Sequence, residues 1–149
     1  MESGTESSKR DQDKAAIADL IGAVVECWNR HDMRSLANLC APDVDFVDVF
    51  GNWFKSRDEA EQALAARHAT VFKASRFTAK ETAIRMLGAD FALAHAVVEL
   101  SGAVGPTGNA VPSSLGVMTY VLGRSSDSNW NILAFQNTTS MPAPGAAGP

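Results

Sequence analysis

Hydrophobic side chains recur at helical spacing near the start of the chain, and this pattern predicts an amphipathic helix over about residues 13–30. The stripe consists of Ile17, Leu20, Ile21, Val24, Val25 and Trp28. The polar residues 29–32 (NRHD) interrupt it, and Asp32 is well placed as the N-cap of a short second helix. That second helix is expected to run through Leu36, Leu39 and Cys40.

A short hairpin and a third helix are predicted next. Hydrophobic and polar residues alternate over residues 43–50 (DVDFVDVF), which is typical of a half-buried strand. Gly51 and Asn52 accept positive φ angles, so residues 53–56 (WFKS) are expected to return as the second strand of a hairpin. The third helix is expected to start at Asp58 and to reach about residue 73. Its apolar face carries Ala60, Leu64, His68, Val71 and Phe72.

From Arg76 onward the chain changes to long extended segments, at 76–87, 91–104, 113–124 and 130–140. The breaks between them, at 88–90, 105–112 and 125–129, are rich in turn-forming residues. Helices grouped before a run of strands predict an α+β fold, in which three N-terminal helices pack on one face of a curved antiparallel sheet.

One domain over residues 13–140 accounts for most of the chain. A length of 149 residues with 46% hydrophobic side chains is enough for one such domain and its core. Residues 1–12 are polar and Ser-rich, and residues 141–149 are rich in Pro, Gly and Ala. Both ends are expected to be disordered tails, because neither buries enough apolar surface to offset the entropy of ordering it.

Charge and composition indicate which classes of partner the protein binds and in which cellular compartment it is expected. The formal net charge of -4 provides no basic field for phosphate, so nucleic acid is not expected as a partner. No secretion signal and no run of roughly 18 to 20 apolar residues is present, so we expect a cytoplasmic protein with no membrane partner. Cys27 and Cys40 fall on apolar stretches of predicted helices and are expected to be reduced and buried. Residues 102–108 (GAVGPTG) lack the spacing and context of a dinucleotide loop, and no cofactor is predicted.

Asp48 is the residue that breaks the strand pattern. It shares one face of the predicted strand with Val44, Phe46 and Phe50, where period-2 geometry predicts another hydrophobic side chain. A carboxylate between two phenylalanines is poorly solvated, and such a setting suits acid–base chemistry. The alternatives are a hydrogen-bonded structural role or a solvent-facing position on a curved edge strand.

Two stretches of the chain resemble the SnoaL-like superfamily, also called the nuclear transport factor 2-like superfamily or the ketosteroid-isomerase-like cone. They are residues 16–60 (AIADLIGAVVECWNRHDMRSLANLCAPDVDFVDVFGNWFKSRDEA) and 116–139 (GVMTYVLGRSSDSNWNILAFQNTT), and the resemblance extends over about residues 13–140. Residues 45–54 (DFVDVFGNWF) and the second stretch most resemble the SgcJ/EcaC-type subfamily, whose members occur in gene clusters for enediyne polyketides.

The resemblance implies a cone of curved sheet closed by helices around a deep pocket, commonly in a homodimer formed through the outer face of the sheet. The fold alone leaves the function open, because this cone hosts isomerases, cyclases, dehydratases, hydrolases and non-catalytic binders. Aligned with the ketosteroid isomerase pattern, Asp48 falls at the general base, which would let it move a proton next to a carbonyl. Val24 falls at the oxyanion-donating tyrosine and cannot donate, so a true ketosteroid isomerase is not expected.

His68 and His95 are the candidate catalytic partners of Asp48. His68 shares a helical face with hydrophobic residues, and His95 alternates with Leu93 and Val97 on a strand. Both could point inward, either as core side chains or as orienting partners for a base. No ligand spacing supports a metal site, so none is predicted. His31, in the NRHD turn, is expected on the surface.

Aromatic and strand residues are candidates for the wall of a ligand pocket. A cavity walled by aromatic rings with few polar groups suits a flat, hydrophobic, weakly charged ligand. Strand parity places His95 and Glu99 on one face and Met118 and Tyr120 on another, without showing which face is concave. The resemblance favours Asn137 as the inward polar residue near the end of the last strand. The ligand-binding candidates are Trp28, Phe46, Phe50, Trp53, Phe72, Val97, Glu99, Met118, Tyr120 and Asn137.

Two hypotheses of function follow. In the first, the protein binds a hydrophobic, enediyne-type polyketide intermediate and assists proton transfer or cyclisation through Asp48 with His68 or His95. In the second, a non-catalytic accessory protein shelters a labile intermediate or partners a polyketide synthase. Whether the chain is an enzyme stays open here, and epoxide hydrolysis is a third alternative. SgcJ/EcaC members are often labelled oxidoreductases, yet no residue supports a nucleotide-dependent redox mechanism.

Overall fold

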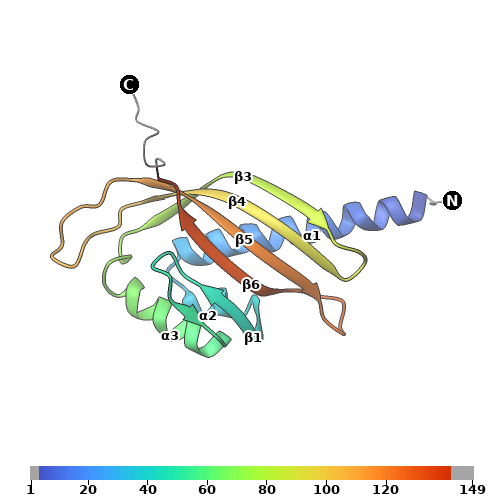
Figure 1. The fold of residues 1–149 in the computed structure, drawn as a ribbon, viewed down its shortest axis with the longest axis horizontal. Helices are drawn as coiled ribbons and strands as arrows, with labels where there is room; N and C mark the ends of the chain where they lie inside the picture. Colours follow the sequence, from blue (N-terminus) through green and yellow to red (C-terminus); the bar gives the residue numbers. More distant parts are fainter. Residues whose placement is uncertain (1–3, 142–149) are drawn as a thin grey trace, which may run out of the picture.

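The computed structural model describes residues 4–141, in which three helices precede and accompany a six-stranded sheet (Figure 1). The elements are α1 (Gly4–Asn29), α2 (Met33–Ala37), β1 (Cys40–Val47), β2 (Trp53–Phe54), α3 (Arg57–His68), β3 (Arg76–Met86), β4 (Phe91–Ser101), β5 (Ser114–Arg124) and β6 (Trp130–Thr139). The predicted α+β class is confirmed, as is the placement of the long strands after the helices.

The sheet has the strand order β2-β1-β6-β5-β4-β3. Strands β3 to β6 form an antiparallel meander, whereas β1 joins the far side of β6 in a parallel pair. The pairing of Val47 with Gln136 brings the end of β1, where Asp48 begins the next turn, beside the second half of β6. The sheet is curved and does not close on itself, as Figure 1 shows.

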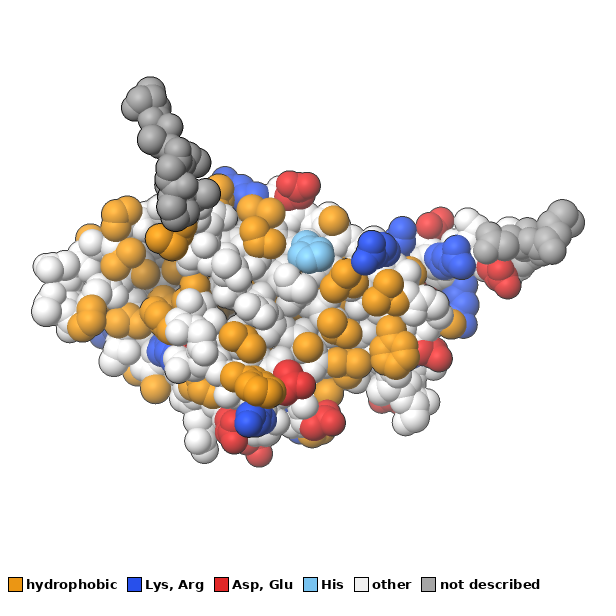
Figure 2. Space-filling view, viewed as in Figure 1, with side chains coloured by type: hydrophobic (Ala, Val, Ile, Leu, Met, Phe, Trp, Pro, Cys, Tyr) orange, Lys and Arg blue, Asp and Glu red, His pale blue; other side chains and the backbone are white. Residues whose placement is uncertain are grey.

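The helices cover one face of the sheet and leave the other face open. In Figure 1, α1 passes behind β5 and β6, and α2 and α3 lie beside β1. Figure 2 looks onto the open face, which we call the outer face; hydrophobic and uncharged side chains predominate over the strands there, and charged side chains lie mainly at its margins. The covered face is concave and contains the core.

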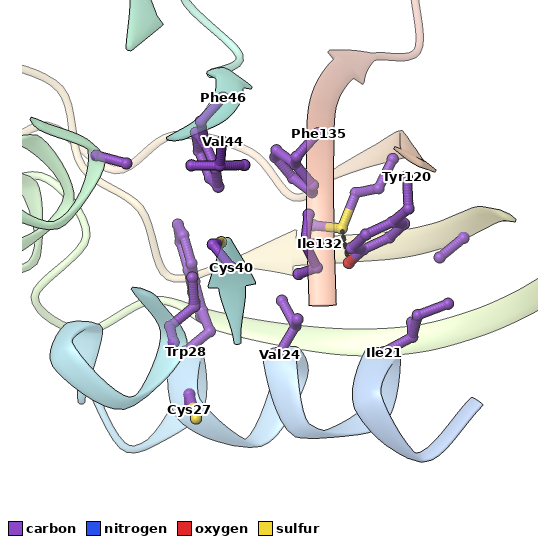
Figure 3. Packing of buried hydrophobic residues seen from close by; sticks show 14 of the residues in the cluster. Ile21, Val24, Cys27, Trp28, Cys40, Val44, Phe46, Tyr120, Ile132 and Phe135 are labelled. Carbon is purple, nitrogen blue, oxygen red and sulfur yellow. Dashed lines mark hydrogen bonds between the residues drawn. The ribbon is translucent and has the colours of Figure 1, made fainter. Parts of the chain in front are cut away.

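The predicted stripe of α1 is the part of the helix that enters the core. Ile17, Ile21, Val24 and Trp28 are all buried, as the helical period predicts. Figure 3 shows Ile21, Val24 and Trp28 pointing from α1 toward the sheet side chains of Tyr120, Ile132 and Phe135. Val44 and Phe46 of β1 close the same cluster from a third side, and Phe46 stacks on Phe135 with ring centres 4.4 Å apart.

The N-terminal end of α1 differs from the predicted boundary. Helix α1 begins at Gly4, so that residues 4–12 of the predicted N-terminal tail are helical and exposed, apart from the core (Figure 1). Lys9, Arg10 and Gln12 are good helix formers, and they extend a helix already nucleated by its packed second half. Residues 1–3 and 142–149, which the predicted tails include, lie outside the described residues.

The second and third helices are shorter than predicted. Asp32 caps α2 as expected, by accepting a hydrogen bond of 3.1 Å from the Ser35 backbone N–H. The helix ends at Ala37, so Cys40 starts β1, opposite Ile132, instead of lying on a helix. Helix α3 starts one residue early, because Ser56 is its N-cap, and ends at His68, after which the chain forms successive turns.

The two cysteines are free and buried, and burial raises the pKa of the Cys40 thiol to about 12. That environment keeps the thiol protonated and unreactive at neutral pH. Among the helices of residues 4–141, none has the length and hydropathy needed to cross a bilayer.

Candidate functional site

A cavity of about 660 Å³ lies between the helices and the concave face of the sheet. Val24 and Trp28 of α1 form one wall, Phe46 of β1 and Leu64 of α3 form another, and Met118 and Tyr120 of β5 lie on the sheet side. Nearly all lining side chains are apolar. The polar side chains on the wall include Asp48, Arg67, Ser114 and Asn137.

The alternation of side chains along the long strands decides which of the predicted ligand-binding residues reach this cavity. Val98 and Leu100 of β4 line it, as do Met118 and Tyr120 of β5. His95, Val97 and Glu99 lie at the alternate positions of β4, and hence on the outer face. We predicted that His95, Val97 and Glu99 line the pocket. The structure corrects this, because their side chains point to the face of β4 opposite to that of Val98 and Leu100.

Seven of the predicted ligand-binding residues do line the cavity: Trp28, Phe46, Phe50, Phe72, Met118, Tyr120 and Asn137. Trp53 does not, since it sits on the short edge strand β2 with 57% of its surface exposed. Its indole Nε1 donates a 2.9 Å hydrogen bond to Asp45, on the neighbouring strand β1. This contact turns the ring away from the interior.

Asp48 lies on the cavity wall directly after β1, and hydrogen bonds occupy its whole carboxylate. Oδ1 accepts from the backbone N–H groups of Phe50 and Asn52, each at 2.9 Å. Oδ2 accepts from the Asn52 side-chain amide at 3.2 Å and forms an ion pair with Arg67. A carboxylate offers about four acceptor positions, so these four donors use all of them. The geometry favours the structural alternative, in which Asp48 orders a turn.

Arg67 extends from α3 to the same turn. Its guanidinium carbon lies 5.0 Å from the centre of the Phe50 ring and 5.7 Å from that of Phe54. Both distances are within the range of cation–π attraction. Arg67 therefore links Asp48, Phe50 and Phe54 at the rim of the cavity.

The two predicted histidines do not join Asp48. His95 lies on the outer face, with the sheet between it and the cavity. His68 is adjacent to Arg67 on α3, and neighbouring helical side chains point about 100° apart, so His68 is directed elsewhere. It is 7% exposed and packs edge-on against Trp28, with ring centres 4.3 Å apart. The three predicted catalytic side chains are therefore not assembled into one group.

His68 instead pairs with His31, at the end of α1. The two Nδ1 atoms lie 2.8 Å apart, and burial, followed by the proximity of His31, lowers the pKa of His68 to about 4. His31 is on the surface, as expected, and adopts a left-handed φ of 58°. Within residues 4–141, the His68 Nε2 atom has no hydrogen-bond partner.

Asn137 reaches the cavity from β6, and its Oδ1 atom is buried without a hydrogen-bond partner among the described residues. Gly116, across from the end of β6, makes room for this amide: a Cβ atom there would lie 2.9 Å from Oδ1. A buried acceptor left unpaired costs about 1 to 3 kcal/mol, which a donor from a bound molecule could offset. Asn137 is thus a polar contact point in an otherwise apolar wall.

Sequence reasoning missed Arg67 and Gly116. Arg67 is separated from Asp48 by 19 positions, and Gly116 from Asn137 by a strand pairing, so neither contact leaves a local signal. Across the described part of the chain, no group of three or more His, Cys, Asp or Glu side chains has the arrangement of a metal site.

The chain is similar to known proteins in both sequence and fold. The family model for the SnoaL-like domain matches residues 21–124. A search of curated proteins finds no match.

Among solved structures, one similar protein is an uncharacterized protein with a cystatin-like fold from Caulobacter vibrioides, at 25% identity and a TM-score of 0.81, covering 89% of this chain and 92% of that chain. An NTF2-like protein with a cystatin-like fold from Novosphingobium aromaticivorans has 15% identity and a TM-score of 0.79, with 95% and 91% covered. A ketosteroid isomerase-like protein from Erwinia carotovora atroseptica has 17% identity and a TM-score of 0.74, with 86% and 96% covered. These similarities establish the NTF2-like fold.

Proposed function

Because the chain belongs to the SnoaL-like domain family and encloses an apolar cavity, we propose that it binds a hydrophobic small molecule there. The cavity volume of about 660 Å³ carries this proposal, since small-molecule sites in proteins span roughly 300 to 1,000 Å³. Rings of Trp28, Phe46 and Phe72 on the wall suit a flat or extended apolar ligand.

The polar groups of the wall suggest which chemical groups the ligand carries. Asn137 Oδ1 lacks a donor among the described residues, so a ligand hydroxyl or N–H at this point would gain a hydrogen bond. The Tyr120 hydroxyl donates to the Met118 sulfur at 3.4 Å, a weak acceptor that a carbonyl oxygen of a ligand could replace. We therefore expect a mostly apolar molecule with a few oxygen functions.

A polyketide-derived intermediate fits this description, because such molecules combine long unsaturated carbon skeletons with scattered carbonyl and hydroxyl groups. The resemblance of residues 45–54 and 116–139 to the SgcJ/EcaC-type subfamily supports an intermediate of enediyne type in a cytoplasmic biosynthetic route. Native mass spectrometry of protein taken from its own producer tests this part. A retained mass that corresponds to a polyene or polyketide supports it, and a retained ligand of another class contradicts it.

The state of Asp48 favours sheltering of the ligand over acid–base catalysis. Its four acceptor positions are already used, and neither His68 nor His95 is in place to orient it as a base. General-base catalysis requires a carboxylate oxygen within hydrogen-bond reach of the substrate proton. If Asp48 were nevertheless the base, Asp48→Asn would abolish product formation in the producing strain while ligand affinity persisted.

We also propose that two copies associate through the outer face of the sheet. Val117 and Phe91, on the outer face, are 37% and 51% exposed, and Figure 2 shows charged side chains mainly at the margins of this face. An exposed apolar surface of this kind is typical of an interface between proteins. Sedimentation equilibrium should detect a dimer, and Val117→Glu should shift it toward monomer. A monomer at all concentrations contradicts this proposal.

Binding in the cavity can be tested with the neutral fluorescent probe N-phenyl-1-naphthylamine. Val98 is 2% exposed and lines the cavity, whereas the adjacent Val97 faces outward, so the two residues form a matched pair. Val98→Phe should weaken probe binding about ten-fold or more by filling the cavity, and Val97→Phe should leave it unchanged. Leu100→Trp, at a less buried position on the wall, serves as a second filling variant if Val98→Phe lowers stability. Equal binding by all four proteins would place the probe outside the cavity.

A further inference from the structure

We propose that Phe50 is the gate of the cavity, and that Asp48 and Arg67 are positioning residues that hold its ring across the entrance. This inference rests on the proposed ligand binding and adds how the ligand enters and leaves.

The entrance is marked by lining residues that are also open to solvent. Phe50, Val111, Leu115 and Met141 all line the cavity, yet 59%, 44%, 43% and 80% of their surfaces are exposed. The deeper lining side chains of Met118 and Tyr120 are 1% and 0% exposed. These four side chains therefore lie where the cavity opens to solvent, and Phe50 is the aromatic one among them.

The turn that carries Phe50 is built by Asp48. The Gly51 N–H donates to the Asp48 carbonyl at 3.0 Å, and Gly51 adopts the left-handed φ of 82° that the turn requires. The Asp48 carboxylate then binds the N–H groups of Phe50 and Asn52, so that one side chain ties both sides of Gly51 together. The backbone on which Phe50 stands has a defined conformation for this reason.

The ring itself is held by α3 and by the turn region that follows it. The Arg67 guanidinium packs over Phe50 while it is ion-paired with Asp48, so the same cation fixes both the turn and the ring. On the cavity side, Phe50 stacks nearly parallel to Phe72, at 14° with ring centres 6.2 Å apart. Arg67 contacts Asp48, Phe50 and Phe54 at the rim. Loss of its charge would therefore free the Phe50 ring to move while leaving the ring in the protein.

Phe50 gains little from burial where it stands. With 59% of its surface exposed, this residue contributes less to the core than a buried phenylalanine would, yet its ring contacts both Phe72 and the Arg67 guanidinium. Trp53, on the same hairpin, is 57% exposed but has no contact with the cavity. Trp53 is held outside the cavity by its hydrogen bond to Asp45, whereas Phe50 is held at the entrance by Arg67 and Phe72.

The test is stopped-flow fluorescence with N-phenyl-1-naphthylamine on the full-length chain. Phe50→Ala should raise both the association and the dissociation rate constants about ten-fold, and it should change Kd by less than about three-fold, since a gate affects passage in both directions. Arg67→Met and Asp48→Asn should shift both rates in the same direction, as each releases the ring. Trp53→Ala is the matched control and should leave both rates unchanged.

Rates in Phe50→Ala equal to those of the wild type would overturn the gate while leaving ligand binding in place. A faster dissociation with an unchanged association rate would overturn it too, because Phe50 would then be an ordinary contact of the bound probe. No saturable binding to the wild-type protein would remove both the gate and the proposed function. If Asp48→Asn lowers the melting temperature strongly, Arg67→Met supplies the same readout in a chain whose turn keeps the Asp48 hydrogen bonds.

Discussion

The imidazole rings of His31 and His68 share a hydrogen bond between their Nδ1 atoms, 2.8 Å apart, where the end of α1 meets the end of α3. One ring must donate and the other must accept, so the pair is incompatible with protonation of both rings. His31 reaches this position because it follows α1 in a turn, in a left-handed conformation, with its N–H bonded to the Trp28 carbonyl at 2.9 Å. The pair joins two helices behind the cavity wall.

This histidine pair predicts a loss of stability in mild acid. The folded protein holds the pKa of His68 at about 4, below its ordinary value of 6.5, because burial disfavours the charged ring. The unfolded chain therefore takes up the proton first, and the free energy of unfolding falls as the pH drops from about 6.5 to about 4. The contribution of His68 is at most about 3 kcal/mol, measurable by urea denaturation across this pH range.

The variant His68→Gln isolates that contribution from the carboxylates, which also titrate in acid. Glutamine can still hydrogen bond with His31 but carries no titratable group, so its stability curve should be flatter than that of the wild type between pH 6.5 and 4. A wild-type curve parallel to that of His68→Gln would contradict the assignment.

Gly102 is expected to tolerate no side chain. Its φ is 78°, and a Cβ atom would lie 2.4 Å from the backbone carbonyl oxygen of Ala74. Gly102→Ala should therefore cost more than about 2 kcal/mol, since left-handed strain and a clash with the main chain add together. Gly88 is the matched control, with a φ of 84° and nothing within 4 Å of its would-be Cβ, so Gly88→Ala should cost only about 1 kcal/mol. Thermal denaturation of both variants checks the difference.

Ser56 fixes the start of α3 and thereby the helix that carries Arg67. Its side chain accepts a 3.1 Å hydrogen bond from the Glu59 N–H, and Glu59 in turn accepts from the Lys55 N–H at 2.9 Å. Ser56→Ala should lower the free energy of unfolding by about 1 kcal/mol, a typical value for loss of an N-cap. Ser56→Asp retains an acceptor and should restore most of the loss. If the wild type, Ser56→Ala and Ser56→Asp all denature at the same urea concentration, the cap has no energetic role.

Replacement of Asn137 by an apolar residue should stabilise the ligand-free protein and weaken its binding of a hydrogen-bond-donating ligand. Asn137→Leu removes a buried acceptor that has no partner among the described residues, which should raise stability by about 1 kcal/mol. In competition with N-phenyl-1-naphthylamine, the variant should lose affinity for 2-naphthol, which donates a hydrogen bond, and keep its affinity for 2-methylnaphthalene.

The adjacent, outward-facing Gln136 provides the control for this experiment, because it is exposed on the other face of β6. Gln136→Leu should change neither the melting temperature nor the preference between the two naphthalenes. An unchanged preference in Asn137→Leu would show that its amide does not contact the ligand hydroxyl.

Much of the architecture could be predicted from local patterns, because they act within a few residues. The residues from Ile17 to Trp28 form a single hydrophobic stripe, which is the face that the helix buries. The Asp32 side chain caps an N–H only three residues further along the chain, and Gly51 adopts by itself the positive φ that its turn requires. Strand parity also correctly placed Met118 and Tyr120 on one face of the sheet, and His95 and Glu99 together on one face. The errors lay at helix ends, from one residue at the start of α3 to nine residues at the start of α1, because packing and capping decide where a helix begins and ends.

The sequence by itself thus determined the elements, their order and the grouping of side chains on each strand face, since these depend on neighbours along the chain. Only the tertiary structure decided which face became concave, and so placed Val98 inside and His95 outside. It also decided the role of Asp48, whose cationic partner, Arg67, comes from another element 19 positions away. The role of a carboxylate depends on the hydrogen-bond donors around it. The donors to Asp48 come together only when the sheet curves and α3 packs beside β1.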